Sequence, residues 1–502
     1  MPSIQYEMRP FRAPLLPDDG SIGSTALSKL SYQSEALPDR APFLLRTDSL
    51  GSTVTSSKTS SQIEPALVRA PFHLLRTNSR RSDAPEKTSY HSLQAELGDR
   101  KEQDFWQHTR KPFFIKIAAV FVLLQLLFLG NLSYLYGSLW GSSDRVSSLN
   151  VLWLDLDGGV IGESVNSAYE SLRGSNFPSF DKPIGSELQS VAEALDAVRA
   201  GLYWAAFVVN PNASARLARA LASGEAARTY QASDALTYIW NEVRYPPFSD
   251  EALMSSFELL AQAAEQEYHH RQGQPALQNL NRNSSAAVQV LFHPIGISGV
   301  NIMETTNPTR LLYNTATMVM PVLEQFFFVL ILNGLSDELG IYKKVPATTT
   351  GIIRVAFAFG YTLLSALGMT GYIWAFRETW SVDGKQFGLT WVTFWLLHTV
   401  HFVVVDTAAA FWPVPVMPFF ILTWIVLNLA SSVSPLQLNP AFYHWGYALP
   451  DNEAYSLLTD IWSSGAVPVL HRALPILFAW LLVGSSTAIF GHFRRCRLAH
   501  DT

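Results

Sequence analysis

The sequence is poor in charged residues and contains a single cysteine. Charged residues make up 15% of the 502 residues, whereas soluble globular domains usually contain about a quarter. The lone Cys496 excludes an intrachain disulfide, so a domain outside the cytosol has to rely on its own hydrophobic core. The net charge of −5 provides no basic surface for nucleic acid. The low content of charged residues therefore indicates membrane-spanning segments.

Two functional signals are also absent. The first 100 residues contain no apolar run of the length that a cleavable secretory signal needs, so we expect the first hydrophobic segment to act as an uncleaved signal anchor. No Gly-x-x-x-x-Gly-Lys-Ser/Thr motif occurs, and we therefore expect no ATP hydrolysis through a P-loop. A partner ATPase or an ion gradient remains open as an energy source.

Residues 1–104 are rich in Ser, Thr, Pro and Arg and show no sustained hydrophobic period. Such a composition predicts a disordered cytosolic tail. The ten residues from Arg40 are repeated in similar form from Arg69, and each copy places an arginine three residues before a serine, Ser49 or Ser79. This spacing predicts phosphorylation by a basophilic kinase; the alternative is a drifted duplication that no kinase recognises.

Six apolar segments follow, each close to the roughly 20 residues that a membrane-spanning helix needs. They predict an α-helical polytopic membrane protein with one anchor helix and, after a large intervening domain, a five-helix bundle over residues 313–490. Lys116 and Arg354 lie near span ends, where long side chains can extend to the headgroups. The small residues of the third segment predict close helix packing; they are Gly360, Ser365, Ala366, Gly368 and Gly371. The segments are residues 113–136, 313–335, 352–376, 389–411, 414–433 and 473–490.

The distribution of lysine and arginine predicts the orientation. Eleven of these residues lie near the span ends on one side, whereas the opposite short loops carry only Arg377, Lys385 and Arg472. The eleven are Arg100, Lys101, Arg110, Lys111 and Lys116 before or at the start of the first span, Lys343, Lys344 and Arg354 between the second span and the start of the third, and Arg494, Arg495 and Arg497 after the sixth. Cytosolic loops are enriched in positive charge. Both termini are therefore expected in the cytosol, including the basic tail 491–502, and residues 137–312 outside it.

The outer segment, residues 137–312, alternates short strand-like and helix-like stretches. Such alternation predicts an extracytosolic α/β domain with a small sheet. The expected strands are residues 149–155, 203–210 and 235–245, and the expected helices are 161–172, 213–223 and 250–271. Sequons at Asn212 and Asn283 are candidate glycosylation sites, whereas the sequon at Asn131 falls inside the first span. Residues 434–472 combine prolines with aromatic rings and predict an interfacial or re-entrant piece.

One short motif suggests chemistry. The strand-like stretch ends in Asp155-Leu156-Asp157-Gly158, which resembles the first motif of haloacid-dehalogenase phosphatases, where one carboxylate is the nucleophile and the next is a general acid aided by Mg²⁺. The alternative is a turn between a strand and a helix. We favour the turn because the motif follows the anchor directly and no convincing partner motifs lie downstream. We therefore expect no enzyme activity, no catalytic residue, no cofactor and no metal site.

Ionisable residues inside the spans are more informative. Glu324 lies in the second span, and His398, His401 and Asp406 lie in the fourth. Because charge is costly in hydrocarbon, such residues usually face a bundle interior or a wet cavity. His398 and His401 are three residues apart and share a helix face, and Asp406 is offset from it. They predict a proton relay or a site for a cationic substrate; the alternative is polar contact between helices.

Local segments and their order resemble a known family. The segments are residues 150–158 after the anchor, 204–209 in the outer segment, Asn307-Pro308 before the second span, and 445–450 before the sixth. The layout over residues 105–495 resembles the fungal nitrosoguanidine-resistance family (DUF3533), which is similar to phage-infection-protein and ABC-2-type membrane domains.

This resemblance implies a plasma-membrane protein linked to drug and toxicant tolerance, through export of amphiphilic compounds or through membrane lipid organisation. It supplies no catalytic residue. The other hypothesis is a non-transporting regulator or scaffold that acts through the outer domain and the phosphorylatable tail. The lipid bilayer is the expected partner and nucleic acid is not; an ATPase partner and a homo-oligomer are left open.

Overall fold

The computed structural model describes residues 87–182, 188–305 and 307–501, so the repeats with Ser49 and Ser79 lie outside the described residues. The chain forms two units, residues 1–112 and 113–502, and each is treated by itself. In the first unit, the described part is the start of helix α1 (Lys87–Leu139). Residues 87–104, expected to be disordered, are thus helical here. They are rich in Glu, Gln, Lys and Leu, which favour helices.

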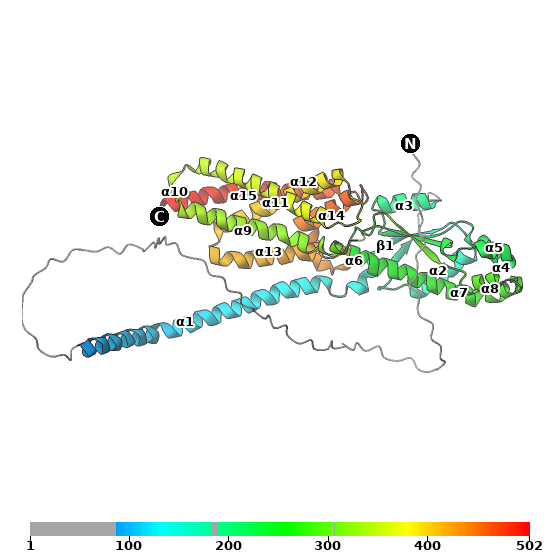
Figure 1. The fold of residues 1–502 in the computed structure, drawn as a ribbon, viewed down its shortest axis with the longest axis horizontal. Coiled ribbons are helices and arrows are strands. Elements are labelled where there is room, and N and C mark those ends of the chain that lie inside the picture. The colour runs from blue at the N-terminus through cyan, green and yellow to red at the C-terminus, as the bar shows by residue number, and fades with distance from the viewer. Residues whose placement is uncertain (1–86, 183–187, 306, 502) are drawn as a thin grey trace, which may run out of the picture. The chain divides into compact units, whose positions relative to one another are not determined.

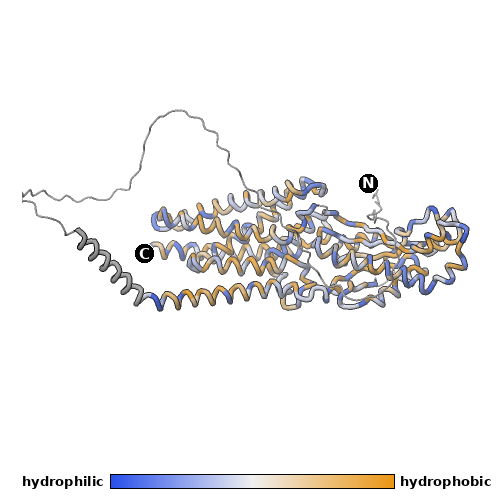
Figure 2. Tube along the Cα trace, turned by 60° about the horizontal axis from the view of Figure 1, so that its bottom comes forward, coloured by the Kyte–Doolittle hydropathy of each residue, from blue (hydrophilic) through white to orange (hydrophobic). Residues whose placement is uncertain are grey.

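Six helices of the described residues are long and apolar enough to cross a membrane, and each overlaps one predicted segment. The prediction of an α-helical membrane protein with six hydrophobic spans is therefore confirmed at this level. Figure 2 shows the hydrophobic residues along the second half of α1. The six are Thr109–Leu139 of α1, α9 (Ala316–Glu338), α11 (Ala347–Ala375), α12 (Gly384–Phe411), Val414–Ser432 with α13 (Met417–Ser432), and α15 (Leu470–Asp501).

Helix α12 lies in the interior of the bundle. It contacts α9, α11 and α15, and 56% of its apolar stretch is buried. Its approach to α15 depends on glycine, because a Cβ atom at Gly484 would overlap Val403 and one at Gly491 would overlap Ala410. Of the small residues for which close packing was predicted in α11, Ala366 is buried and the helix packs against α12, but the three glycines are not at a close contact. A Cβ atom would meet nothing within 4 Å at Gly360, Gly368 or Gly371.

The segment between α13 and α15 contains three short helices, η6 (Leu436–Leu438), η7 (Ala441–Ala448) and α14 (Pro450–Trp462). η7 exposes the rings of Phe442 and Trp445, as expected for aromatic side chains at the headgroup level. At 13 residues, α14 is too short to cross a bilayer. It is buried and packs on α12, α13 and α15, and it therefore brings polar residues into the bundle.

The chain between α1 and α9 forms a five-stranded sheet in the order β2-β1-β3-β4-β5 (Figure 1). β1 is parallel to β2 and β3, β3 is antiparallel to β4, and β4 is parallel to β5. The small sheet is confirmed; β2 and β5 were not predicted, and β4 is shorter than predicted. The strands are β1 (Asn150–Asp155), β2 (Ser179–Asp181), β3 (Ala205–Val209), β4 (Leu236–Trp240) and β5 (Ile297–Asn301).

Helices lie beside these strands. The predicted helices correspond to α2, α4 and α7, and the remaining ones were not predicted. The helices are α2 (Val160–Leu172), α3 (Val191–Arg199), α4 (Ala213–Ala222), α5 (Gly224–Thr229), α6 (Pro246–Phe248), α7 (Ser255–Asn279) and α8 (Ser285–Phe292), with a π-helical turn at Ser249–Met254 before α7.

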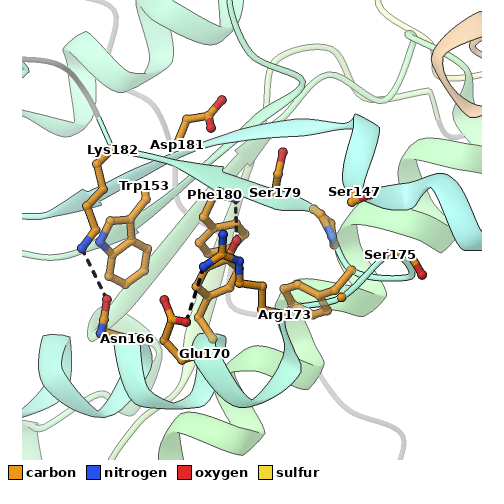
Figure 3. Close-up of a pocket in the computed structure, with 14 residues that line it drawn as sticks. Ser147, Trp153, Asn166, Glu170, Arg173, Ser175, Ser179, Phe180, Asp181 and Lys182 are labelled. Carbon is orange, nitrogen blue, oxygen red and sulfur yellow. Dashed lines mark hydrogen bonds and ion pairs between the residues drawn. The ribbon is translucent and has the colours of Figure 1, made fainter.

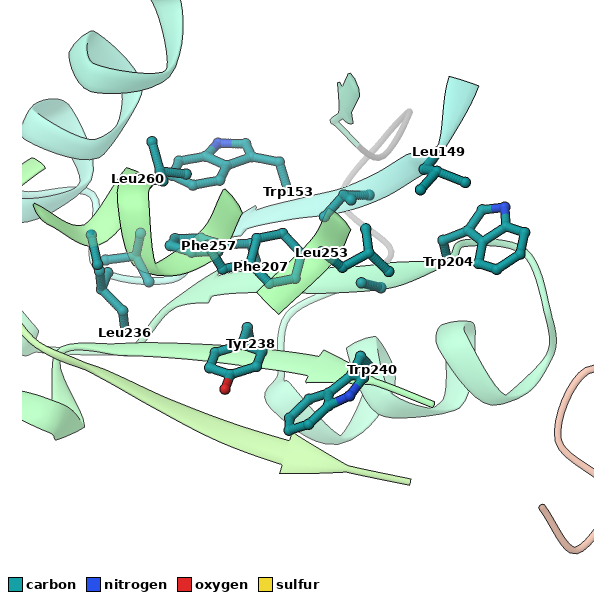
Figure 4. Close-up of a cluster of buried hydrophobic side chains, with 14 of the residues drawn as sticks. Leu149, Trp153, Trp204, Phe207, Leu236, Tyr238, Trp240, Leu253, Phe257 and Leu260 are labelled. Carbon is teal, nitrogen blue, oxygen red and sulfur yellow. The ribbon is translucent and has the colours of Figure 1, made fainter. Parts of the chain in front are cut away.

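Aromatic side chains form the core of this sheet domain. Figure 4 shows Trp153, Phe207 and Tyr238 of the three central strands close to Phe257 of α7. The ring centroids of Phe207 and Tyr238 each lie 5.5 Å from that of Phe257, within the range of favourable aromatic contacts. Because β3 is buried along its whole length, its apolar run suits a strand covered on both faces.

Candidate functional site

The ionisable residues of α12 do not form one common site. His398, His401 and Asp406 are all buried, but each contacts a different set of helices. Of the four residues predicted inside the spans, only Glu324 and His398 are brought together. The other two pair with residues that the sequence had not singled out as intramembrane polar sites.

His398 of α12 forms a hydrogen bond with Glu324 of α9. His398 Nδ1 lies 2.7 Å from the carbonyl oxygen of Phe394, and because a carbonyl only accepts, Nδ1 carries a hydrogen. His398 Nε2 lies 3.1 Å from Glu324 Oε2, a contact that needs one proton on either atom. The His398 side chain is fully buried, whereas that of Glu324 is 32% exposed. The pair therefore reaches the surface through the carboxyl group of Glu324 and not through the imidazole.

His401 is held in one tautomer. Its Nδ1 accepts from the indole N–H of Trp424 at 3.2 Å, and because that indole only donates, Nδ1 is unprotonated. Its Nε2 therefore donates to Asp451 Oδ1, 2.8 Å away. The side chains of His401 and Asp451 are 0% and 1% exposed. These contacts join α12, α13 and α14, which agrees with the alternative of polar contact between helices.

Asp406 is the centre of an ionic cluster formed with Arg354 and Arg495. Arg354 donates through Nε at 3.0 Å and through its second nitrogen to the other carboxylate oxygen, and Arg495 donates at 3.1 Å. Arg354 also donates to the hydroxyl of Tyr342 at 3.1 Å. The expectation that Arg354 extends to the headgroups is wrong, because its guanidinium is buried against Asp406. The ionic cluster therefore ties α11, α12 and α15 together.

A buried polar group at the start of α14 was not predicted from the sequence. Asp451, Asn452 and Glu453 are all buried. Glu453 accepts from Arg472 Nε at 3.1 Å; burial raises the pKa of the Glu453 carboxyl, and the charge of Arg472 opposes that rise. Three consecutive polar residues after Pro450, inside an otherwise aromatic segment, were the signal that could have revealed them.

Asp155 and Asp157 organise a turn. Asp155 Oδ1 accepts from the backbone N–H groups of Asp157 and Gly158, each at 3.0 Å. Asp157 Oδ1 accepts from the backbone N–H of Ser214 at 3.0 Å, at the beginning of α4. These contacts agree with the turn interpretation of the motif. Among the described residues, no group of three or more His, Cys, Asp and Glu side chains is placed to hold a metal ion.

The two candidate glycosylation sites lie on the surface. Asn212 and Asn283 are exposed, which an attached glycan requires. Asn131 is buried, and its amide donates to Thr423 Oγ1 at 3.2 Å. The asparagine of the third sequon is therefore used in a contact between α1 and α13. Glycosylation at Asn212 and Asn283 stays a prediction.

A surface cavity of about 620 Å³ lies beside the edge strand β2. Figure 3 shows Trp153, Phe180 and the Arg173–Glu170 pair among the residues that line it. The rings of Tyr169 and Phe180 stack with centroids 4.5 Å apart, and Arg173 pairs with Glu170 at 3.6 Å with both side chains exposed. Aromatic faces beside exposed charged groups suit an amphiphile, but an exposed ion pair contributes little binding energy.

Comparison with known proteins gives a family without an assigned activity. Residues 120–486 match the family model described as "Protein of unknown function (DUF3533)". The matched range contains the sheet and the Glu324–His398 and His401–Asp451 pairs, and it ends before Arg495. No solved structure matches the chain.

Proposed function

The chain belongs to the DUF3533 family, and on that footing we propose that this integral membrane protein takes part in the export of amphiphilic compounds by exchanging them for protons at Glu324 and His398. The observation that carries the proposal is the one-proton contact between a buried imidazole and a partly exposed carboxyl group. Tolerance of nitrosoguanidine and other toxicants would follow from such export.

The charge states of the pair supply a mechanism. With one proton between them, Glu324 and His398 are either an ion pair or two neutral groups, and the net charge is zero. A cationic amphiphile that approaches the exposed carboxylate would favour loss of that proton, because the cation would neutralise the charge left behind. Ionisable groups in membrane helices commonly serve such relays because an uncompensated charge is costly there. One cation would therefore move against one proton.

The proposal also fixes an orientation and a location. We place both termini in the cytosol and the sheet domain outside it, in the plasma membrane. The ionic cluster occupies Arg354 and Arg495, which leaves nine of the eleven basic residues on the cytosolic side (11 − 2 = 9). That number still exceeds the three on the opposite side, so the bias that orients membrane helices is retained.

The decisive experiment measures efflux of a fluorescent cationic amphiphile from cells and from proteoliposomes with an imposed pH gradient. Glu324→Gln is expected to slow efflux at least tenfold and to remove its dependence on the gradient, because a neutral amide cannot release a proton. Glu338→Gln is the matched control, since that exposed residue ends the same helix.

Two outcomes would contradict the proposal. Wild-type efflux with an unchanged pH profile in Glu324→Gln would exclude proton exchange at this pair. Unchanged accumulation in cells that lack the protein would exclude export itself. The remaining hypotheses would then be membrane lipid organisation and a regulator that acts through the outer domain and the tail. If the tail is required, deletion of residues 1–100 should abolish the resistance phenotype without preventing membrane insertion.

A further inference from the structure

A small polar cavity lies where the sheet domain meets the ends of the membrane helices. Its volume is about 70 Å³. Trp204 and Arg244 line it from the sheet domain, Tyr447 lines it from η7, and Ser456 and Arg472 line it from α14 and α15. The cavity thus combines two arginines from segments far apart in the chain.

Aromatic rings hold both guanidinium groups. The Cζ atom of Arg244 lies 3.4 Å from the ring centroid of Trp204, and that of Arg472 lies 5.4 Å from the ring centroid of Tyr447. A guanidinium that packs face-on against a ring keeps its N–H groups at its edge, in the plane where an oxyanion can accept them. Arg472 donates through its Nε to Glu453, a contact that does not use its terminal nitrogens.

The charged residues that line the cavity are both arginines, Arg244 and Arg472. Glu453 contacts Arg472 outside this lining, and burial disfavours the charged form of that carboxyl. Burial, together with the charge of nearby Arg472, lowers the pKa of Arg244 to about 10. An anion between the two arginines would accept charge-assisted hydrogen bonds from both, which is the setting in which a buried charge is stable.

The size and position of the cavity limit the anion. A cavity of roughly 10–15 Å³ suffices for one water molecule, so about 70 Å³ admits a tetrahedral oxyanion and excludes a nucleotide or a sugar ring. η7, which contributes Tyr447, also exposes Phe442 and Trp445, and such rings favour the headgroup level of a bilayer. Arg472 lies in the first turn of the apolar helix α15. The cavity therefore lies where lipid phosphates are found.

We propose that this cavity binds a phosphoryl group at the membrane boundary, with Arg244 and Arg472 as donors. The phosphoryl group is supplied by a phospholipid headgroup or by free phosphate. Arginine favours this chemistry because its planar fork can donate two parallel hydrogen bonds to phosphate oxygens. Binding here does not require proton exchange at Glu324, so the two proposals stand or fall separately.

The test uses the purified full chain in a neutral detergent and three probes: dioctanoyl phosphatidic acid, dioctanoylglycerol and inorganic phosphate. Phosphatidic acid is expected to bind at least tenfold more tightly than dioctanoylglycerol, which lacks the phosphoryl group. Arg244→Gln should weaken phosphatidic acid binding at least tenfold. Arg377→Gln is the control, because Arg377 lies in the loop between α11 and α12 and donates to Val382, outside the cavity.

A second variant separates binding from folding. Ser456→Leu fills the cavity and removes neither arginine, and it should abolish phosphatidic acid binding while the melting temperature stays near that of the wild type. Displacement by equimolar phosphate would identify free phosphate as the source, and resistance to it would identify the lipid headgroup. Wild-type binding in both Arg244→Gln and Ser456→Leu, or equal binding of dioctanoylglycerol, would overturn the proposal.

Discussion

Replacing Asp406 with asparagine is expected to destabilise the bundle more than any other single change in the ionic cluster. The side chains of Arg354 and Asp406 are 7% and 4% exposed, and that of Arg495 is 13% exposed. Removing one partner of a buried ion pair typically costs about 3–5 kcal/mol, because the remaining charge is left buried and uncompensated. Asp406→Asn leaves two such cations, so the upper part of that range is expected.

The double variant Asp406→Asn/Arg354→Gln tests the reasoning directly. It removes the more buried cation together with the carboxylate, so it should recover at least half of the loss seen for Asp406→Asn alone. Thermal unfolding in mild detergent, followed by size-exclusion chromatography of a fluorescent fusion, ranks the melting midpoints of the wild type and the variants. Asp337→Asn, an exposed residue near the end of α9, is the control. A wild-type midpoint for Asp406→Asn, or a double variant no better than the single one, would refute the argument.

Three further predictions concern other parts of the structure. His401→Leu should lower the melting midpoint, because it leaves a buried carboxylate and an indole N–H without partners, while the pH profile of efflux from the folded protein is retained; a changed profile would assign His401 to the transport site. Gly484→Ala should cost about 1–3 kcal/mol through overpacking, whereas Gly360→Ala, with open space around it, should leave the midpoint unchanged or raise it; the reverse order would contradict the packing described for α12 and α15. The pKa of Glu453 is raised above its ordinary 4.5, so the folded state keeps this proton to higher pH than the unfolded state, and stability falls as pH rises from 4.5 through the folded-state pKa. The melting midpoint of the wild type should therefore fall more steeply over this pH range than that of Glu453→Gln. Parallel pH profiles of the two midpoints would exclude this contribution.

The spans could be predicted because transfer into hydrocarbon depends on the summed composition of about 20 consecutive residues. Strands β1 and β3 were predictable for a similar local reason, since each is a short apolar run bounded by turn residues. β2 has three residues, too few to show a period. β5 contains Ser298 and Gly299 and is partly exposed, so its strand conformation depends on pairing with β4.

The candidate site was predictable only in part. The cost of burying charge identified Glu324, His398, His401 and Asp406, but it said nothing about their partners. Partners depend on how each helix is rotated about its axis and on which helices are neighbours. Asp451 is 50 positions from His401, and Arg495 is 89 positions from Asp406. No local pattern carries information over such separations, so the distinction between an exchangeable pair and a fixed contact needed the structure.

Helix α15 has a charged contact near each end, Arg472 with Glu453 and Arg495 with Asp406. The two arginines are 23 residues apart (495 − 472 = 23), which at roughly 1.5 Å per residue separates them by about 34 Å. This length is close to the ~30 Å of a hydrocarbon core. Since α15 cannot slide along its axis without losing one contact, a thinner or thicker bilayer has to be met by tilting or by deforming the lipid. The protein is thereby matched to one range of membrane thickness, and lipid chain length becomes a determinant of its stability.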